Sequence, residues 1–283
     1  MIDYWHLLLL GSIAGFTIFL GLPLAVLQNV SSKKKGFLNA IAIGILVFLI
    51  IDVFGHAWDS VGNVAQDTFS GKLSVSRGVP TILALFGGLA IGLLGLVFYE
   101  DRFMKKNLKQ KWREASGAGE YQHHQQQLLQ EGNAYRLSMM IAMGIGFHNF
   151  SEGLAIGQAY ASGAIGLAII LIIGFGAHNA TEGFGIAGPL TGLVKKPRIR
   201  FLILVGLVGG GPTFIGTVLG SLWTSTITSV FFLSIAGGAL IYVSMLMYSS
   251  GRKQTTNDIL MLGIFVGLCA GFVTDLIVTL GGA

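Results

Sequence analysis

Charged residues and cysteine are both scarce in this chain of 283 residues. Only 11% of the residues are charged, whereas a soluble domain carries about 25%, so a soluble globule of this size would lack the charge to cover its surface. The single cysteine, Cys269, excludes a disulfide framework and a metal cage of several thiolates. The composition also excludes a disordered tail and a nucleic-acid-binding module, because the basic residues lie in the connections between apolar runs.

Long apolar runs dominate the chain instead. Apolar residues make up 53% of the sequence, and the mean hydropathy is +0.72. A membrane-spanning helix needs about 20 mostly apolar residues. Eight runs meet this length, at 4–27, 37–58, 79–99, 136–160, 164–187, 201–223, 226–248 and 259–280. We therefore expect an all-α membrane protein with eight transmembrane helices, in which residues 1–283 form a single transmembrane domain.

The placement of lysine and arginine agrees with eight spans. If the N-terminus lies outside, the inner connections hold sixteen of the eighteen basic residues, and only Lys72 and Arg77 lie outside. An excess of basic residues in cytoplasmic connections is typical of multi-pass membrane proteins. We therefore expect a cell-membrane protein with both termini outside, whose basic connections contact anionic lipids and not nucleic acid.

Two connections are longer than the others. The outer one, 59–78, is polar, and the inner one, 100–135, is first basic and then rich in glutamine and histidine. We expect 100–135 to be a flexible cytoplasmic loop between spans three and four. Its adjacent histidines, His123 and His124, predict either a solvated stretch or a cytoplasmic contact for metal.

A motif occurs twice, thirty residues apart, in the fourth and fifth predicted spans. Its copies read H-N-F-S-E-G at 148–153 and H-N-A-T-E-G at 178–183, and 144–156 is identical to 174–186 at seven of thirteen positions. Because consecutive spans run antiparallel, the copies form an inverted motif pair, which we expect at the bundle centre near the bilayer midplane.

The spacing within each copy predicts a shared helix face for three polar side chains. His and Glu are four residues apart and Asn and Glu are three apart, so all three project to one side. Ionisable groups inside a membrane are costly and normally mark an ion or proton path. Imidazoles, carboxylates and amide oxygens suit zinc, and also iron, manganese or cobalt. The candidate ligands are His148, Asn149, Glu152, His178, Asn179 and Glu182.

A purely structural role is the alternative, in which each His–Glu pair only joins two helices. Duplication at matching spacing, with glycines that allow close helix approach, favours a metal site over this alternative.

These motifs resemble the HNxPEG-type motifs of the ZIP (zinc/iron-regulated-transporter-like) family of divalent metal transporters. The family has eight spans, both termini outside and a variable inner loop between spans three and four. The resemblance implies a primary metal site of His148, Glu152, His178, Asn179 and Glu182, and a second site that shares the glutamates and uses Asn149 and Asn179.

The resemblance also implies a function. Zn²⁺ would be the substrate, with iron, manganese, cobalt or cadmium as alternatives, and would move into the cytoplasm by alternating access. It further implies a homodimer, no organic cofactor and no enzymatic activity.

Two departures from the family pattern matter. Ser151 and Thr181 stand where the family usually has proline, and we expect their hydroxyls to bond back to the i−4 carbonyl and bend the helices mildly. The Glu-Pro pair that many relatives carry in span six corresponds here to Gly210-Gly211-Pro212. Because that carboxylate is missing, we predict a mononuclear site whose second position is weak or empty.

Three further polar residues predict an access path for the cation. Asp52 and His56 are four residues apart near the outer end of span two, and Asp275 lies in the outer half of span eight. The alternative is polar pairing at the membrane interface. Two other functions stay open, namely an intramembrane zinc-dependent hydrolase and a metal-sensing membrane protein without flux.

Overall fold

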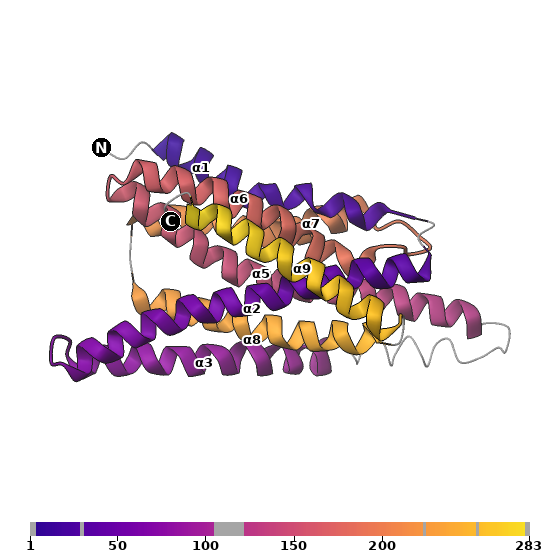
Figure 1. Ribbon diagram of the computed structural model, residues 1–283, viewed down its shortest axis with the longest axis horizontal. Helices are drawn as coiled ribbons and strands as arrows, with labels where there is room; N and C mark the ends of the chain where they lie inside the picture. The colour runs from indigo at the N-terminus through magenta and orange to yellow at the C-terminus, as the bar shows by residue number, and fades with distance from the viewer. Residues whose placement is uncertain (1–3, 29–30, 105–121, 223–224, 253–254, 281–283) are drawn as a thin grey trace.

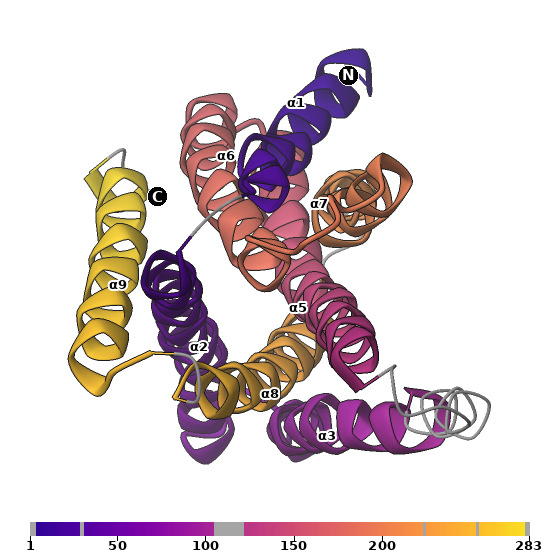
Figure 2. The same ribbon diagram turned by 90° about the vertical axis from the view of Figure 1, so that its right-hand side faces the viewer.

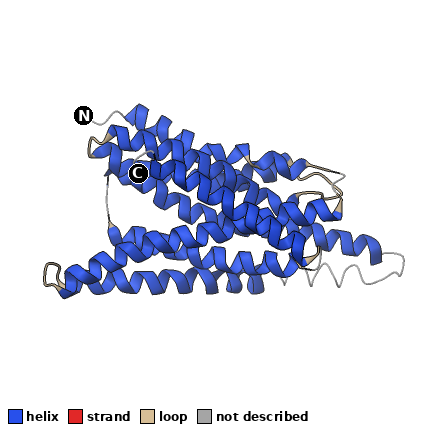
Figure 3. Cartoon of the chain, viewed as in Figure 1, coloured by secondary structure: helices blue, strands red, loops and turns tan. Residues whose placement is uncertain are grey.

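The computed structural model describes residues 4–28, 31–104, 122–222, 225–252 and 255–280. Every regular element within these residues is helical, and none is a strand (Figure 3). The long helices run roughly side by side along one axis (Figure 1). The first helix begins and the last helix ends at the same end of this bundle (Figure 1), which fits an even number of crossings.

Helical segments follow the order of the eight predicted spans. The first is built from α1 (Tyr4–Phe16) and two 3₁₀ turns, η1 (Thr17–Leu20) and η2 (Leu22–Val26). The later ones are α2 (Ser32–Phe69), α3 (Val75–Tyr99), α5 (Gln122–Ala161), α6 (Ile165–Ala187), α7 (Ile199–Leu222), α8 (Thr226–Gly251) and α9 (Asn257–Leu280). Two short elements follow α3 and α6, the π-helical η3 (Glu100–Met104) and the 3₁₀ helix η5 (Gly188–Leu190).

Seven of the described helical segments are long and apolar enough to cross a membrane. The helix α5 is not among them, and it is the least apolar of the long helices. The motif side chains His148, Asn149 and Glu152 are all buried within the protein. A lipid-facing helix has to be apolar, whereas an enclosed helix can carry polar groups that its neighbours satisfy. The fold is therefore all-helical and suited to a membrane, with its least apolar long helix inside the bundle.

Two helices extend beyond the predicted spans. The helix α2 has 38 residues and continues to Phe69, through much of the predicted outer connection. The helix α5 has 40 residues and begins at Gln122, so part of the predicted loop 100–135 is helical. Hydropathy detects only the apolar portion of a helix, and the backbone hydrogen bonds of α2 continue past it. Residues 105–121 of the predicted loop lie outside the described residues.

The first predicted span is not one regular helix. The α-helical part ends at Phe16, and the hydroxyl of Thr17 donates a hydrogen bond to the carbonyl of Ala14 at 2.7 Å. The chain continues as 3₁₀ turns that contain Pro23. At Gly21 it presses against α6, where an added Cβ would lie 2.4 Å from the carbonyl oxygen of Ala180. This break brings backbone carbonyl groups close to the second motif.

Glycines allow α5 and α7 to pack with their backbones in contact. A Cβ on Gly153 would lie 2.2 Å from the carbonyl oxygen of Thr213, and one on Gly157 would lie 2.2 Å from that of Thr217. From the opposite side, a Cβ on Gly216 would meet the carbonyl of Phe150. Figure 2 shows α5 in the middle of the bundle, next to α6, α7 and α8. Close packing therefore fixes the helix that carries the first motif.

Candidate metal centre

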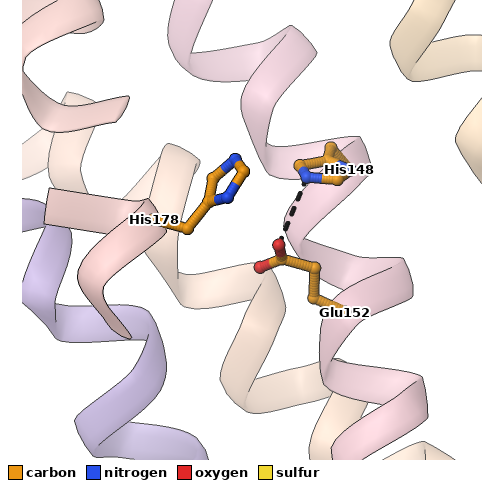
Figure 4. Close-up of side chains that lie close together, drawn as sticks. All are labelled: His148, Glu152 and His178. Carbon is orange, nitrogen blue, oxygen red and sulfur yellow. Dashed lines mark ion pairs between the residues drawn. The ribbon is translucent and has the colours of Figure 1, made fainter. Parts of the chain in front are cut away.

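The two motif copies meet between α5 and α6. These helices are joined by a short turn, and their motif side chains point toward one another. One ligand-type atom from each of His148, Glu152 and His178 lies within 4.8 Å of the other two (Figure 4). The three residues are buried, with exposed fractions of 3%, 6% and 4%. Two helices thus bring imidazole and carboxylate groups to one enclosed point.

The second motif glutamate, Glu182, borders the same point. Its Oε1 atom lies 4.0 Å from Nε2 of His148 and 4.0 Å from Nε2 of His178. Within the first motif, Nε2 of His148 lies 3.3 Å from Oε1 of Glu152. The centroids of the two imidazole rings are 5.8 Å apart. The arrangement therefore clusters two imidazoles and two carboxylates, one of each from either helix.

The motif asparagines are anchored through their amide nitrogens. Nδ2 of Asn149 donates hydrogen bonds to Oε2 of Glu182 at 2.9 Å and to the carbonyl of Gly209 at 3.0 Å. Nδ2 of Asn179 donates to the carbonyl of Ala14, next to the break in the first span, at 2.8 Å. Because the nitrogen atoms are used, the Oδ1 atoms of both asparagines remain available as acceptors or metal ligands.

Several buried ligand-type atoms in this cluster lack a hydrogen-bond partner among the described residues. Buried polar atoms normally have such partners, and a group of exceptions calls for an explanation such as an ion. These atoms are both ring nitrogens of His148, Oδ1 of Asn149, Oε2 of Glu152, Oδ1 of Asn179 and Oε1 of Glu182. A divalent cation would satisfy nitrogen and oxygen lone pairs together, so the donor set fits such an ion.

The hydroxyl groups at the positions of the missing prolines behave differently from the prediction. The hydroxyl of Thr181 donates to the carbonyl of His178, which is the i−3 and not the i−4 group, at 2.7 Å. The hydroxyl of Ser151 is buried and makes no hydrogen bond within the described residues. The predicted i−4 back-bond is therefore wrong at both positions, and α5 and α6 run through their motifs as α-helices.

The structure places Asp52 of α2 beside the cluster. Its Oδ2 atom lies 3.9 Å from Nε2 of His148, and its side chain is 14% exposed. The other carboxylate oxygen, Oδ1, lies 3.6 Å from Nδ1 of His56, whose side chain is 69% exposed. These two residues thus link the buried cluster to the surface of the protein.

The structure gives fewer contacts for Asp275 of the predicted access path and for the loop histidines His123 and His124. Asp275 of α9 is partly buried and interacts electrostatically with Asp52, His178 and His56. His123 and His124 fall in the first turn of α5, and their side chains lie outside the described residues. The predicted cytoplasmic metal contact at these histidines thus stays a prediction.

Sequence reasoning missed the groups that support the cluster from other helices. The ring of Phe48 on α2 packs against the imidazole of His178, with centroids 5.6 Å apart. The carbonyls of Ala14 and Gly209 accept the asparagine hydrogen bonds. The glycine run that begins at Gly209 is a signal for close helix approach, but no pattern in the sequence points to Ala14 or Phe48.

Comparisons with known proteins agree with this geometry. A family model described as "ZIP Zinc transporter" matches residues 39–277. Over 162 residues the chain is 27% identical to "Zinc transporter ZIP10" of Mus musculus, and over 163 residues it is 28% identical to "Zinc transporter ZIP10" of Homo sapiens. Each match covers 54% of this chain and 19% of the relative, so the chain aligns with about a fifth of these longer proteins. Because the family match covers most of the chain, including both motif copies, the chain belongs to the ZIP zinc transporter family.

Proposed function

We propose that this protein transports divalent metal cations across a membrane through the cluster on α5 and α6. The observation that carries this proposal is the enclosed meeting of His148, Glu152 and His178, whose ligand-type atoms lie within 4.8 Å of one another. Glu182 and the oxygen atoms of Asn149 and Asn179 complete the ligand set. Membership of the ZIP zinc transporter family supports the same function.

Zinc is the substrate that we propose first. Imidazole nitrogens and carboxylate oxygens are ordinary zinc ligands, and zinc accepts them in a four-coordinate arrangement. The same donors also accept iron, manganese, cobalt and cadmium, because nitrogen and oxygen sites discriminate weakly among these ions. The relatives' names refer to zinc, and this favours zinc among the candidates.

We propose one principal metal position. The helix α7 spans Ile199–Leu222 and contains no aspartate or glutamate, so it offers no carboxylate for a second ion. The amide of Asn149 is also held by Glu182 and Gly209, which restrains its use by a second metal. A second ion at this point would bring further positive charge, and α7 has no carboxylate to balance it.

Alternating access is the mechanism that we propose, with metal moving into the cytoplasm. A buried cluster has to open to each side in turn, and the partly exposed Asp52 is the group that we assign to capture from the outer side. The excess of basic residues in the predicted inner connections supports an orientation in which both termini lie outside. The homodimer implied by the resemblance belongs to the same proposal.

Uptake of radioactive zinc by the purified full chain in liposomes tests this function. Wild-type protein should show saturable uptake that cold zinc and cadmium reduce. Glu152→Ala and His178→Ala should each lower saturable uptake at least about tenfold, because loss of a ligand weakens metal binding strongly. Wild-type uptake with both glutamates replaced would contradict the proposal, and metal binding without uptake would indicate a sensor.

A matched variant controls for damage to the fold. Glu131 lies on the same helix as Glu152, 21 positions earlier, and is partly buried. Glu131→Ala should therefore retain wild-type uptake, while each ligand variant should remain folded in the membrane and lose it. A loss of uptake in Glu131→Ala would show that any carboxylate removal from α5 disables the protein.

A further inference from the structure

A cavity with a mixed polar and apolar lining lies at the end of the bundle where α2 begins. Its volume is about 240 Å³, which is below the roughly 300–1,000 Å³ of pockets for drug-sized ligands. Asn133, which lines it, is 15 residues before His148 on α5, or about 22 Å along the helix, so the cavity is separate from the metal cluster. Its polar lining consists of Ser32, Lys35 and Asn39 from α2, Asn133 from α5 and Ser250 from α8.

The chemistry of the lining favours an anion. Lys35 is half-buried and forms no ion pair within the described residues, whereas Lys33 and Lys34 next to it are exposed. No carboxylate lines the cavity among the described residues. A cation site would need carboxylate or carbonyl oxygens and would avoid a lysine, so a divalent metal is a poor fit.

A buried amide in the same cavity lacks a partner. Asn39 is 8% exposed, lines the cavity and makes no hydrogen bond within the described residues. Its amide is not among the fully buried atoms that lack a partner, so water or a ligand in the cavity can reach it. A half-buried ammonium without a counterion is costly. An anion that accepts hydrogen bonds from both Lys35 and Asn39 would offset that cost.

The start of α2 adds to the positive potential. Its first residue, Ser32, lines the cavity, and Ser31 caps the helix by accepting a hydrogen bond from the backbone of Lys34. The N-terminus of a helix carries a partial positive charge and unpaired N–H groups. The first residue of α2, Lys35 and Asn39 therefore all line one small cavity.

A phosphate group is an anion that can accept hydrogen bonds from these donors. Because the cavity lies at one end of the membrane-spanning bundle, a lipid headgroup is the source of phosphate that we consider. The basic loop with Lys195 and Lys196 lies at the same end, held there by a hydrogen bond from Gly192 N to Leu27 O at 3.0 Å. Basic pockets between membrane helices at the cytoplasmic side bind anionic lipid headgroups. We propose that the cavity binds the phosphate group of an anionic phospholipid in the adjacent leaflet.

A phosphate bound in this cavity would contact both α5, which carries the first metal motif, and α2. The residues that line the cavity come from α2, α5, η5 and α8, and from Leu193 after η5. Because α5 carries the first metal motif, a bound phosphate would link the motif helix to α2 and stabilise the arrangement described here. The proposal depends on the chain lying in a membrane and not on metal transport.

Lipid binding to the purified full chain in detergent tests the proposal. The probes are phosphatidylglycerol and phosphatidylcholine, and the readouts are native mass spectrometry and the midpoint of thermal unfolding. Phosphatidylglycerol should bind saturably and raise the midpoint more than phosphatidylcholine does. Lys35→Gln should weaken this binding about tenfold, since it removes a charge-assisted hydrogen bond, and Asn39→Leu should weaken it without changing any charge.

Lys33→Gln is the matched control, because it removes the same charge two residues away from an exposed position. It should keep phosphatidylglycerol binding within about twofold of wild type. Equal losses in Lys33→Gln and Lys35→Gln would overturn the proposal in favour of diffuse surface charge. Equal binding of both lipids, or displacement of phosphatidylglycerol by millimolar inorganic phosphate, would overturn it as well.

Discussion

Asn149 on α5 donates a hydrogen bond from its amide nitrogen to the carboxylate of Glu182 on α6, at 2.9 Å. This bond joins the two motif copies and orients one of the four ionisable groups in the cluster. Its donor is held in turn by the carbonyl of Gly209 on α7 at 3.0 Å. Three helices thus determine where the carboxylate of Glu182 points.

Replacing Asn149 by alanine should weaken zinc binding about 10- to 100-fold, because groups that orient a metal ligand contribute on that scale. The measurement is the concentration of zinc at half-maximal uptake in liposomes. Asn63→Ala, at an exposed position of α2, is the control and should leave that concentration unchanged. Equal values for Asn149→Ala and wild type would mean that Glu182 needs no such support.

Replacing Asp52 by asparagine should raise the half-maximal zinc concentration about fivefold, while Asp59→Asn should not. The carboxylate of Asp52 lies 3.9 Å from His148, and a unit charge at that distance contributes about 1 kcal/mol even in water. Asp59 is on the same helix but is exposed. If both variants changed uptake equally, the effect would come from surface potential and not from the contact with the cluster.

Gly153→Ala should destabilise the protein by about 1–3 kcal/mol, the usual cost of overpacking. The added methyl group would lie 2.2 Å from the carbonyl oxygen of Thr213, so α5 and α7 would have to separate. The measurement is thermal unfolding in detergent. Gly166→Ala meets nothing within 4 Å and should leave stability unchanged or raise it by up to about 1 kcal/mol.

Arg136→Met should destabilise the bundle by about 3–5 kcal/mol, because it leaves a buried carboxylate unpaired. Nη1 of Arg136 lies 2.8 Å from Oε1 of Glu100, and the hydroxyl of Tyr242 donates to the other carboxylate oxygen. Arg200→Met, at an exposed position, is the control. Thermal unfolding should also show partial recovery in the double variant Arg136→Met/Glu100→Gln, and no recovery would contradict this account.

The spacing of polar residues predicted which side chains could gather in one cluster, and the structure brings His148, Glu152 and His178 together. Residues four apart on a helix share a face whatever surrounds them, so His148 with Glu152 and His178 with Glu182 were expected to form two adjacent pairs. The apolar runs predicted the order of the helical segments, and seven of the described segments are long and apolar enough to cross a membrane.

Features that depend on other helices could not be predicted in this way. The contact of Asp52 with His148 requires the packing of α2 against the motif helices, and the Ala14 carbonyl is available to Asn179 because the first span breaks at Phe16. The full lengths of α2 and α5 were missed because polar residues continue a helix without any hydropathy signal. Ser151 lacks the predicted back-bond, and nothing in its local sequence distinguishes it from Thr181, which has one to i−3.

X-ray absorption spectroscopy of zinc bound to the purified protein tests the central claim most directly. The account predicts one tightly bound zinc per chain, with only nitrogen and oxygen ligands at about 2.0–2.2 Å and with two imidazoles among them. His178→Ala should then remove one imidazole from the spectrum. A wild-type spectrum in His178→Ala, or sulfur among the ligands, would contradict the claim that α5 and α6 hold the ion between them.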